Sequence, residues 1–308
     1  MITALQILVA WLLDRLLGEP RRAHPLVGFG RLAARIERAV YGGNGVSPSQ
    51  RRLRGLLGWA LAVMPFVLLA ALLQRLPAPL AQAVGVALLY LALGGRSLRE
   101  HGLAVVRALG RGDLALARRR VGYMVSRETV SLDAEGVRRA TVESILENGN
   151  DAVFGALFWF ALAGIPGVVL YRLANTLDAM WGYRNERYRH FGTFAARADD
   201  LLNWFPARLT GLAYGLAGRT RQALRCWRAQ APDWEGINPG VVMAAGAGAL
   251  GLRLGGPARY HGIRIERPAL GCGETVAGGD AIERALALLD RAQGLVLAAI
   301  LTGGLFLA

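Results

Sequence analysis

Uncharged apolar runs dominate the first hundred residues of the chain. Residues 55–73 and 78–95 carry no charge, and each is close to the roughly 20 apolar residues that cross about 30 Å of hydrocarbon. Only residues 74–77 separate them, so we expect a transmembrane hairpin. The runs 2–13 and 294–308 are shorter, and we expect them to span with support from neighbouring helices. The pattern predicts a polytopic membrane protein.

A further apolar run, residues 152–174, has a turn sequence in its middle. Residues 164–167 read Gly-Ile-Pro-Gly, which interrupts a helix. A single crossing would also place the Arg-rich residues 184–197 outside, against the tendency of positive loops to stay in the cytoplasm. We therefore expect a re-entrant hairpin of two short helices. Residues 201–217 are apolar but interrupted, and we expect them at the membrane interface or buried against other helices.

The polar segments complete the organisation. Residues 18–54 are rich in Arg and Gly and contain turn-forming sequence, so we expect a cytoplasmic loop there. Residues 96–150 are helical and polar in pattern and predict a cytoplasmic helical lobe. The start of the chain has no basic region before its apolar run, so we expect no cleavable signal peptide. The fold prediction is a single all-α membrane domain, residues 1–308, with the lobe 96–150 inside it.

The amino-acid composition excludes several kinds of catalytic and phosphate-binding site. The chain has 308 residues, 54% of them hydrophobic, and a formal charge of +14. It contains no lysine, so all 36 basic residues are arginine. Lysine Schiff bases and a P-loop lysine are therefore excluded, and any bound phosphate must be held by Arg, backbone N–H groups or a metal. We expect the positive charge to meet membrane lipid headgroups and anionic substrates, and we expect no nucleic-acid partner.

The remaining metal-binding and redox residues are few. The only cysteines, Cys226 and Cys272, are too far apart in the sequence to indicate a zinc site or a disulfide framework, so we expect two ordinary reduced thiols. The four histidines form no HExxH pair, which disfavours a catalytic zinc helix.

Three carboxylates lie at helical spacing in the sequence TVESILENGND. Glu143, Glu147 and Asp151 stand at i, i+4 and i+8, so a helix would place them along one face. Like charges at this spacing destabilise a helix unless a cation such as Mg²⁺ or an Arg cluster lies beside them. The alternative is an ordinary solvated helix face. Because Asp151 directly precedes the apolar run 152–174, where a bare carboxylate is costly, the position favours a functional role.

A second acidic pair, Asp199 and Asp200, precedes Asn203 in the sequence ADDLLNWFPAR. Oxygen ligands at this spacing suit Mg²⁺, which proteins commonly hold with one or two carboxylates plus substrate phosphates. Alternatively, Asp199 caps the helix that follows. Between the two acidic groups lies an Arg-rich strip around Arg184, which contacts either lipid phosphates or an anionic substrate.

Several strings together resemble one family. They are LLDRLLGEPRRAHPLVGFGRL, VGYMVSRETVSLDAEGVRRATVESILEN, YRLANTLDAMWGYRNERYRHFGTFAARADDLLNWFPARLTGL and MAAGAGALGLRLGGP, followed by YHG and ERP. Over nearly the whole chain, and in the same order, they resemble the adenosylcobinamide-phosphate synthase family. The resemblance implies an integral inner-membrane enzyme that joins adenosylcobyric acid to (R)-1-aminopropan-2-ol O-phosphate, using ATP and Mg²⁺ to form an amide.

The family pattern falls on specific residues of this chain. In sequence order these are Asp14, Glu19, His24, Pro25, Ser126, Arg127, Glu128, Thr129, Glu143, Glu147, Asn148, Asp151, Asn175, Asp178, Tyr183, Arg184, Asn185, Asp199, Asp200, Asn203, Pro206 and Arg208. Two strings depart from the pattern: Gly149-Asn150-Asp151-Ala152, which keeps its Asp, and the segment where Met243 replaces the usual Glu. The second departure argues against a universal catalytic role for that Glu.

The resemblance and the residues together give the predicted site. We expect a set of five carboxylates to act in catalysis and to bind Mg²⁺: Glu143, Glu147, Asp151, Asp199 and Asp200. We expect a second set to bind substrate: His24, Arg127, Tyr183, Arg184, Asn185, Asn203 and Arg208, with Arg127, Arg184 and Arg208 holding phosphates. The corrinoid is a substrate, and a complex with other membrane enzymes of the pathway is a further expectation. The alternatives are a non-enzymatic membrane regulator of the same superfamily and a transporter.

Overall fold

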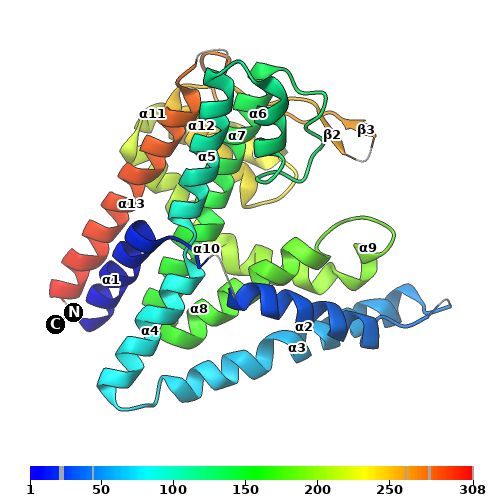
Figure 1. Ribbon diagram of the computed structural model, residues 1–308, viewed down its shortest axis with the longest axis vertical. Coiled ribbons are helices and arrows are strands. Elements are labelled where there is room, and N and C mark those ends of the chain that lie inside the picture. Colours follow the sequence, from blue (N-terminus) through cyan, green and yellow to red (C-terminus); the bar gives the residue numbers. More distant parts are fainter. Residues whose placement is uncertain (21–23, 44, 261, 277–278, 307–308) are drawn as a thin grey trace. The chain divides into compact units, whose positions relative to one another are not determined.

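The computed structural model describes residues 1–20, 24–43, 45–260, 262–276 and 279–306 (Figure 1). Helices predominate, and the described residues contain only four strands, each of two or three residues, in two antiparallel pairs. This confirms the predicted all-α fold. Contacts divide the described chain into unit 1, residues 1–94 and 155–203, and unit 2, residues 95–154 and 204–306. The predicted lobe 96–150 falls inside unit 2.

The two units have the following elements. Unit 1 contains α1 (Ile2–Leu17), α2 (Pro25–Val40), α3 (Pro48–Leu73), α4 (Ala78–Ala92), α8 (Gly155–Trp181), α9 (Tyr188–Phe191) and the first part of α10 (Thr193–Ala217). Unit 2 contains α5 (Gly95–Gly110), α6 (Leu114–Val121), α7 (Ala134–Gly149), the π-helical turn η1 (Asn150–Phe154), the rest of α10, α11 (Thr220–Gln230), the 3₁₀ turn η2 (Ala231–Asp233), α12 (Pro239–Leu250), β1 (Leu254–Gly255), β2 (Ala258–Tyr260), β3 (Ile263–Ile265), β4 (Ala269–Leu270) and α13 (Ala281–Phe306).

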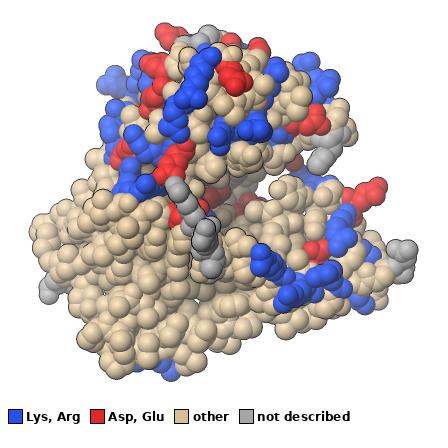
Figure 2. Space-filling model, viewed as in Figure 1, with Lys and Arg blue, Asp and Glu red and all other residues tan. Residues whose placement is uncertain are grey.

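Four helical stretches in the described part of the chain are long and apolar enough to cross a membrane. They are Pro48–Leu73, Ala78–Gly110, Ala134–Trp181 and Ala281–Phe306. In the face shown in Figure 2, α4 and the adjoining part of α3 present a mostly uncharged surface, while Arg side chains gather over α5 and α6. These features confirm the polytopic membrane class. Of the predicted C-terminal run 294–308, the last two residues lie outside the described part.

Helix α8 reverses direction at Gly164, as the turn sequence predicts. Gly164 has φ 63° and ψ −140°, a backbone conformation that favours glycine. Trp159 Nε1 donates to Leu202 O at 2.9 Å, and Tyr171 OH donates to Asn203 Oδ1 at 2.9 Å. A straight helix would separate residues 159 and 171 by about 18 Å along its axis. The two arms of α8 therefore run antiparallel beside the same segment of α10.

The turn of α8 at Gly164 contacts the turn between α3 and α4. Ile165 N donates to Gln74 Oε1 at 2.9 Å, and a Cβ added at Gly164 would overlap that same oxygen. Helices α3 and α4 each pack extensively against α8, which contributes the main contacts of both. Both helices of the predicted hairpin 55–95 are formed, and α8 packs against each of them (Figure 1).

The predicted loop 18–54 contains a helix, which corrects that expectation. Pro25 occupies the first turn of α2, where a missing N–H costs nothing, and His24 Nδ1 accepts from Leu26 N at 3.2 Å. Phe29, Ala33 and Glu37 are buried at i, i+4 and i+8. The helix was overlooked because its apolar stripe is narrow and its other faces carry the arginines that suggested a loop.

Unit 2 is built around α12. Every residue from Gly240 to Leu250 is buried, and most of them are Ala or Gly. Small side chains let the neighbouring helices approach closely: a Cβ at Gly246 would crowd Leu146 of α7, and one at Gly248 would crowd the backbone of Ala223 in α11. Met243 is a 2% exposed core residue. Helices α5, α7 and α13 complete this core.

Candidate functional site

A buried charge cluster lies in unit 2. Glu143 Oε2 accepts from Arg127 Nη2 at 2.6 Å and from Arg267 Nη2 at 3.2 Å, and Glu143 Oε1 accepts from Gly255 N at 2.8 Å. The side chains of Glu143 and Arg127 are 4% and 7% exposed. A buried carboxylate is tolerated only when it is paired and its lone pairs are filled, and these three donors meet both needs.

Local structure brings Arg127 to the cluster. Asp133 Oδ1 caps α7 by accepting from Gly136 N at 2.7 Å, which fixes the start of the helix that carries Glu143. Ser144 Oγ, one residue after Glu143, donates to Met124 O at 2.8 Å. Glu128 accepts from Gly262 N and donates its own N–H to Arg259 O, so the β2–β3 hairpin holds the segment that contains Arg127.

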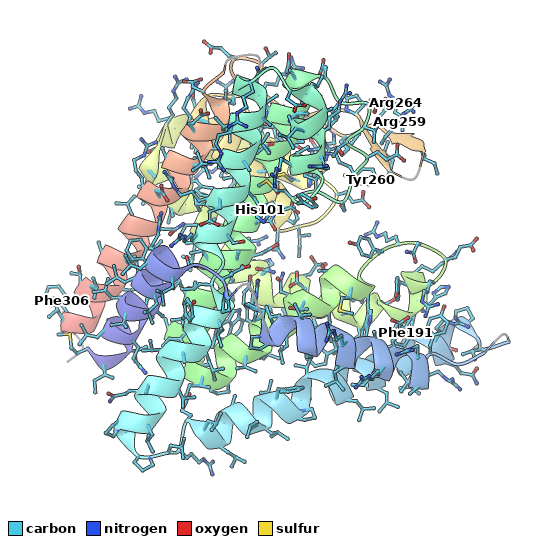
Figure 3. The ribbon with its side chains drawn as sticks, viewed as in Figure 1. His101, Phe191, Arg259, Tyr260, Arg264 and Phe306 are labelled. Carbon is cyan, nitrogen blue, oxygen red and sulfur yellow. The ribbon has the colours of Figure 1, made fainter. Side chains whose placement is uncertain are left out.

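Arg267 and Gly255 reach the cluster through the β1–β4 pair. Gly255 pairs with Ala269, and its φ of 77° requires glycine because a Cβ would overlap Pro268 O. Arg267 also donates from Nε to Gly256 O at 3.1 Å, and its guanidinium stacks 5.0 Å from the ring centre of Trp234. In Figure 3, Arg259 and Arg264 extend from the nearby β2–β3 hairpin.

Glu147 and Asp151, the other two carboxylates of the predicted helix face, differ from Glu143 in their contacts. Glu147 lies one turn along α7 and interacts electrostatically with Glu143, Arg127 and Arg267. Asp151 lies in the π-helical turn η1, where the wider winding changes the helical register. Its Oδ1 accepts from Asn150 Nδ2 at 3.0 Å, and Asn150 Oδ1 accepts from Thr210 at 2.9 Å. π-turns are frequent at functional sites, which supports the interest in this segment.

Arg208 opens onto a pocket of about 290 Å³ in unit 2. It donates to Asn238 Oδ1 at 3.1 Å and to Trp204 O at 2.7 Å, and its guanidinium lies 4.1 Å from the ring centre of Trp204. The pocket is also lined by Trp227, Arg228 and Trp234. Burial lowers the pKa of Arg208 from its ordinary value. The pocket thus combines two aromatic rings with two guanidinium groups, and Trp234 links it to Arg267.

The second acidic pair lies in unit 1, within a polar network between α8 and α10. Asp199 Oδ1 accepts from Asn175 Nδ2 at 3.2 Å, and Asp199 Oδ2 accepts from Asn203 Nδ2 at 3.0 Å. Asn203 in turn accepts from Tyr171. Because α10 begins at Thr193, Asp199 lies inside the helix, and the alternative role as its cap is wrong. Asn203, which was expected to bind substrate, therefore orients the carboxylate of Asp199.

Burial sets the protonation of this pair. Desolvation raises the pKa of Asp199 to about 6, and the two amide donors oppose that rise. Desolvation also raises the pKa of Asp200, whereas the positive charges of Arg184 and Arg197 oppose it. Burial therefore makes the protonated form of both carboxylates more favourable than it is in water.

The remaining predicted substrate residues of unit 1 are spread over two places. Tyr183, Arg184 and Asn185 are exposed in the segment between α8 and α9, where Asn185 Oδ1 accepts from Tyr188 N at 2.9 Å. His24 caps α2 instead. The structure places Glu143, Glu147, Asp151, Arg127 and Arg208 in unit 2 and the other predicted site residues in unit 1.

The contacts of these carboxylates decide how well a divalent metal would fit. Among the described residues, no group of three His, Cys, Asp or Glu side chains is arranged to hold a metal ion. A metal at Glu143 would have to displace two arginines, and one at Asp199 would have to displace two amides. These two carboxylates do not fit direct metal ligation in this arrangement. The metal role of the five carboxylates stays a prediction.

Sequence reasoning missed several members of these sites. Arg267 and Trp234 were not singled out, although Arg267 is the Arg of the ERP string. Cys226 and Cys272 are free thiols, as expected, but their proximity was not predicted: they are 46 residues apart in the chain, and their Sγ atoms lie 3.0 Å apart. Gln230 joins the same segments by exchanging two hydrogen bonds with Gly271. Such proximity across a fold has no local sequence signature.

The fold and these sites define a polytopic helical membrane protein with a buried arginine–carboxylate centre. Residues 7–289 match the family described as CobD/Cbib protein, and the chain belongs to that family. It is 59% identical to the cobalamin biosynthesis protein CobD of Chromobacterium violaceum, covering 99% of each chain. It is 58% identical to the protein of that name from Stutzerimonas stutzeri, covering 97% of each. The Mycobacterium tuberculosis protein of that name is 41% identical over 92% of this chain and 90% of its own. No solved structure matches the chain.

Proposed function

We propose that this chain acts in cobalamin biosynthesis as an adenosylcobinamide-phosphate synthase, joining adenosylcobyric acid to (R)-1-aminopropan-2-ol O-phosphate with ATP. The observation that carries the proposal is 58–59% identity, over nearly the full length, to two proteins named for cobalamin biosynthesis. The intact acidic and arginine motifs support an enzyme rather than a regulator that has lost them.

The reaction needs activation of the substrate carboxylate. We propose that a carboxylate oxygen attacks the γ-phosphorus of ATP, which gives an acyl phosphate and ADP. The amine nitrogen then attacks the acyl carbon, the C–O bond to phosphate breaks, and inorganic phosphate leaves with the bond electrons. One ammonium proton must be removed before the attack and a second after it. In such transfers the protein contributes mainly positioning and neutralisation of charge.

The residues of unit 2 supply suitable groups for that work. Arg208 faces the 290 Å³ pocket beside Trp227, so we assign this pocket to the nucleotide, with the ring for stacking and the guanidinium for phosphate. Arg127 is too buried to meet a phosphate freely. We propose that Arg127 is a positioning residue. It holds the carboxylate of Glu143 in place, and that carboxylate in turn orients Arg267.

Glu147 is the proposed base for the ammonium proton. Its carboxylate has no hydrogen bond to a described residue, in contrast to that of Glu143. A divalent cation bound with ATP would neutralise phosphate charge. We propose that turnover also requires the carboxylate of Asp200 in unit 1.

The test is product formation by the purified protein in lipid nanodiscs. Wild-type protein should form the amide only when adenosylcobyric acid, the aminopropanol phosphate, ATP and Mg²⁺ are all present. Glu147→Gln and Asp200→Asn should each lower turnover at least 100-fold and keep the thermal unfolding of the wild type. Glu100→Gln, at an exposed surface pair, is the matched control. Near wild-type turnover of both variants at low Mg²⁺ would contradict their assignment, and no product from wild type would contradict the function.

A further inference from the structure

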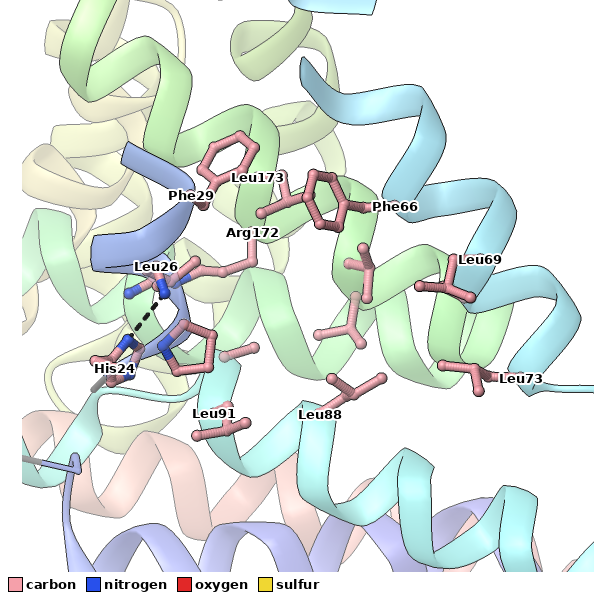
Figure 4. A pocket seen from close by; sticks show the side chains of 15 residues that line it. His24, Leu26, Phe29, Phe66, Leu69, Leu73, Leu88, Leu91, Arg172 and Leu173 are labelled. Atoms are coloured by element: carbon pink, nitrogen blue, oxygen red, sulfur yellow. Dashed lines mark hydrogen bonds between the residues drawn. The ribbon is translucent and has the colours of Figure 1, made fainter. Parts of the chain in front are cut away.

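Unit 1 contains a cavity of about 190 Å³ that lies among α2, α3, α4 and α8 (Figure 4). Its apolar walls are formed by Phe29, Phe66, Leu69, Leu73, Leu88 and Leu91, among others. Apolar cavities of about 150 Å³ already admit benzene, so this one has room for several methylene groups. The proposed reaction does not use this cavity.

Arg172 lines the cavity without a countercharge. Its Nε is buried and has no hydrogen-bond partner among the described residues. Its Nη1 donates to Asn175 Oδ1 over a long 3.4 Å, and no described carboxylate lies within salt-bridge distance of it. A largely buried cation is unfavourable unless an anion neutralises it. The cavity therefore has one cationic end that an anionic ligand would stabilise.

His24 adds a second donor at the same end. Its Nδ1 accepts from Leu26 N at 3.2 Å, so the proton of the neutral ring lies on Nε2. Figure 4 shows Arg172 and His24 on one side of the cavity and Leu69 and Leu73 on the other. The ligand must therefore combine an anionic group with a hydrocarbon chain.

The cavity opens toward the surface of α3. Phe66 and Leu69 line it and are nevertheless 37% and 51% exposed. Because α3 is one of the four helices apolar enough to span, that surface faces hydrocarbon when the protein is in a membrane. We propose that the cavity binds an anionic phospholipid, with one acyl chain between α3 and α4 and the phosphate against Arg172 and His24.

Native mass spectrometry of the full-length protein, delipidated in detergent, tests this. The probes are phosphatidylglycerol and phosphatidylcholine with identical acyl chains. The wild type should retain one phosphatidylglycerol at least tenfold more strongly than phosphatidylcholine, because only the former brings a net negative charge to Arg172. Inorganic phosphate at millimolar concentration should not displace it, since the acyl chain supplies much of the binding.

Two variants and a control locate the site. Arg172→Gln should remove the preference for phosphatidylglycerol, and Leu88→Trp, which fills the cavity, should weaken both lipids at least tenfold. Leu68→Trp, at a 61% exposed position on α3 outside the cavity, should change neither. Lipid-induced shifts in thermal unfolding provide a second readout for any variant that folds less well. Equal binding of the two lipids by wild type, an undiminished preference in Arg172→Gln, or displacement by inorganic phosphate would overturn the proposal.

Discussion

Arg127 and Glu143 form an ion pair of 2.6 Å between side chains that are only 7% and 4% exposed. The two residues are 16 positions apart, and the loop between them is fixed by the cap of α7 and by the Ser144–Met124 hydrogen bond. Arg267, from a distant part of the sequence, completes the pair on its other side. Removing one member would leave buried charge without a partner.

Glu143→Gln should therefore destabilise unit 2 by about 3–5 kcal/mol, the usual cost of breaking a buried ion pair from one side. Thermal or denaturant unfolding of the detergent-purified protein measures this. Glu266→Gln is the control, because Glu266 pairs with Arg264 on the surface, where both side chains are more than 60% exposed. We expect a change below about 1 kcal/mol there. Equal stabilities of the two variants would show that the buried pair contributes no more than a surface one.

Gly164→Ala should weaken the reversal of α8. An alanine at φ 63° is strained by about 1 kcal/mol or more, and its Cβ would also overlap Gln74 Oε1, which Ile165 needs as an acceptor. The expected result is a lower unfolding temperature and a smaller yield of folded protein. Gly294→Ala, at a helical glycine of α13 with open space around it, should be neutral or slightly stabilising. A loss of stability in the control but not in Gly164→Ala would contradict the hairpin.

The cysteine pair predicts a pH effect. Burial, reinforced by the contact with Cys272, raises the pKa of Cys226 from 9.0 to about 12. The folded state thus holds this proton more tightly than the unfolded state, so its stabilising contribution is present below pH 9 and is lost as pH rises toward 12. At pH 8, iodoacetamide should modify Cys272 first and spare Cys226, whereas both should react after denaturation. Rapid modification of Cys226 in the folded protein would contradict this environment.

Cysteine labelling tests the predicted sidedness. The antiparallel arms of α8 return the chain, so the Arg-rich segment after it should lie on the cytoplasmic side together with α5. After replacement of Cys226 and Cys272, single cysteines at Arg99 and Arg189 should both resist an impermeant thiol reagent applied to the periplasmic face. Labelling at position 189 but not at 99 from that face would show that α8 and its flanks cross once.

Local patterns predicted much of this fold, and contacts distant in sequence account for what they missed. The apolar runs predicted α3 and α4, and Gly164 with Pro166 predicted the reversal of α8. The helix α2 was missed because its arginines hide a narrow apolar stripe. The packing of α8 against both α3 and α4 depends on interlocking side chains, which no single run reveals.

For the candidate sites too, local patterns predicted some residues, and contacts distant in sequence account for the rest. Helical spacing identified Glu143 and Glu147, and the structure places both on α7. Spacing did not indicate that Glu143 would be neutralised by Arg127 and Arg267, since Arg267 arrives through the β1–β4 pair more than a hundred residues later. The π-helical turn at Asp151 also departs from the regular i+8 spacing, and only the backbone itself shows it.

We propose that this chain forms an amide by way of an acyl phosphate, and tracing of carboxylate oxygen distinguishes this route from others. Adenosylcobyric acid carrying ¹⁸O in both oxygens of its reacting carboxylate is turned over by the purified protein with ATP and the aminopropanol phosphate. We expect one ¹⁸O in the inorganic phosphate and one in the amide for each product formed, with ADP as the spent nucleotide. Product whose formation places ¹⁸O in AMP, or leaves the phosphate unlabelled, would contradict it.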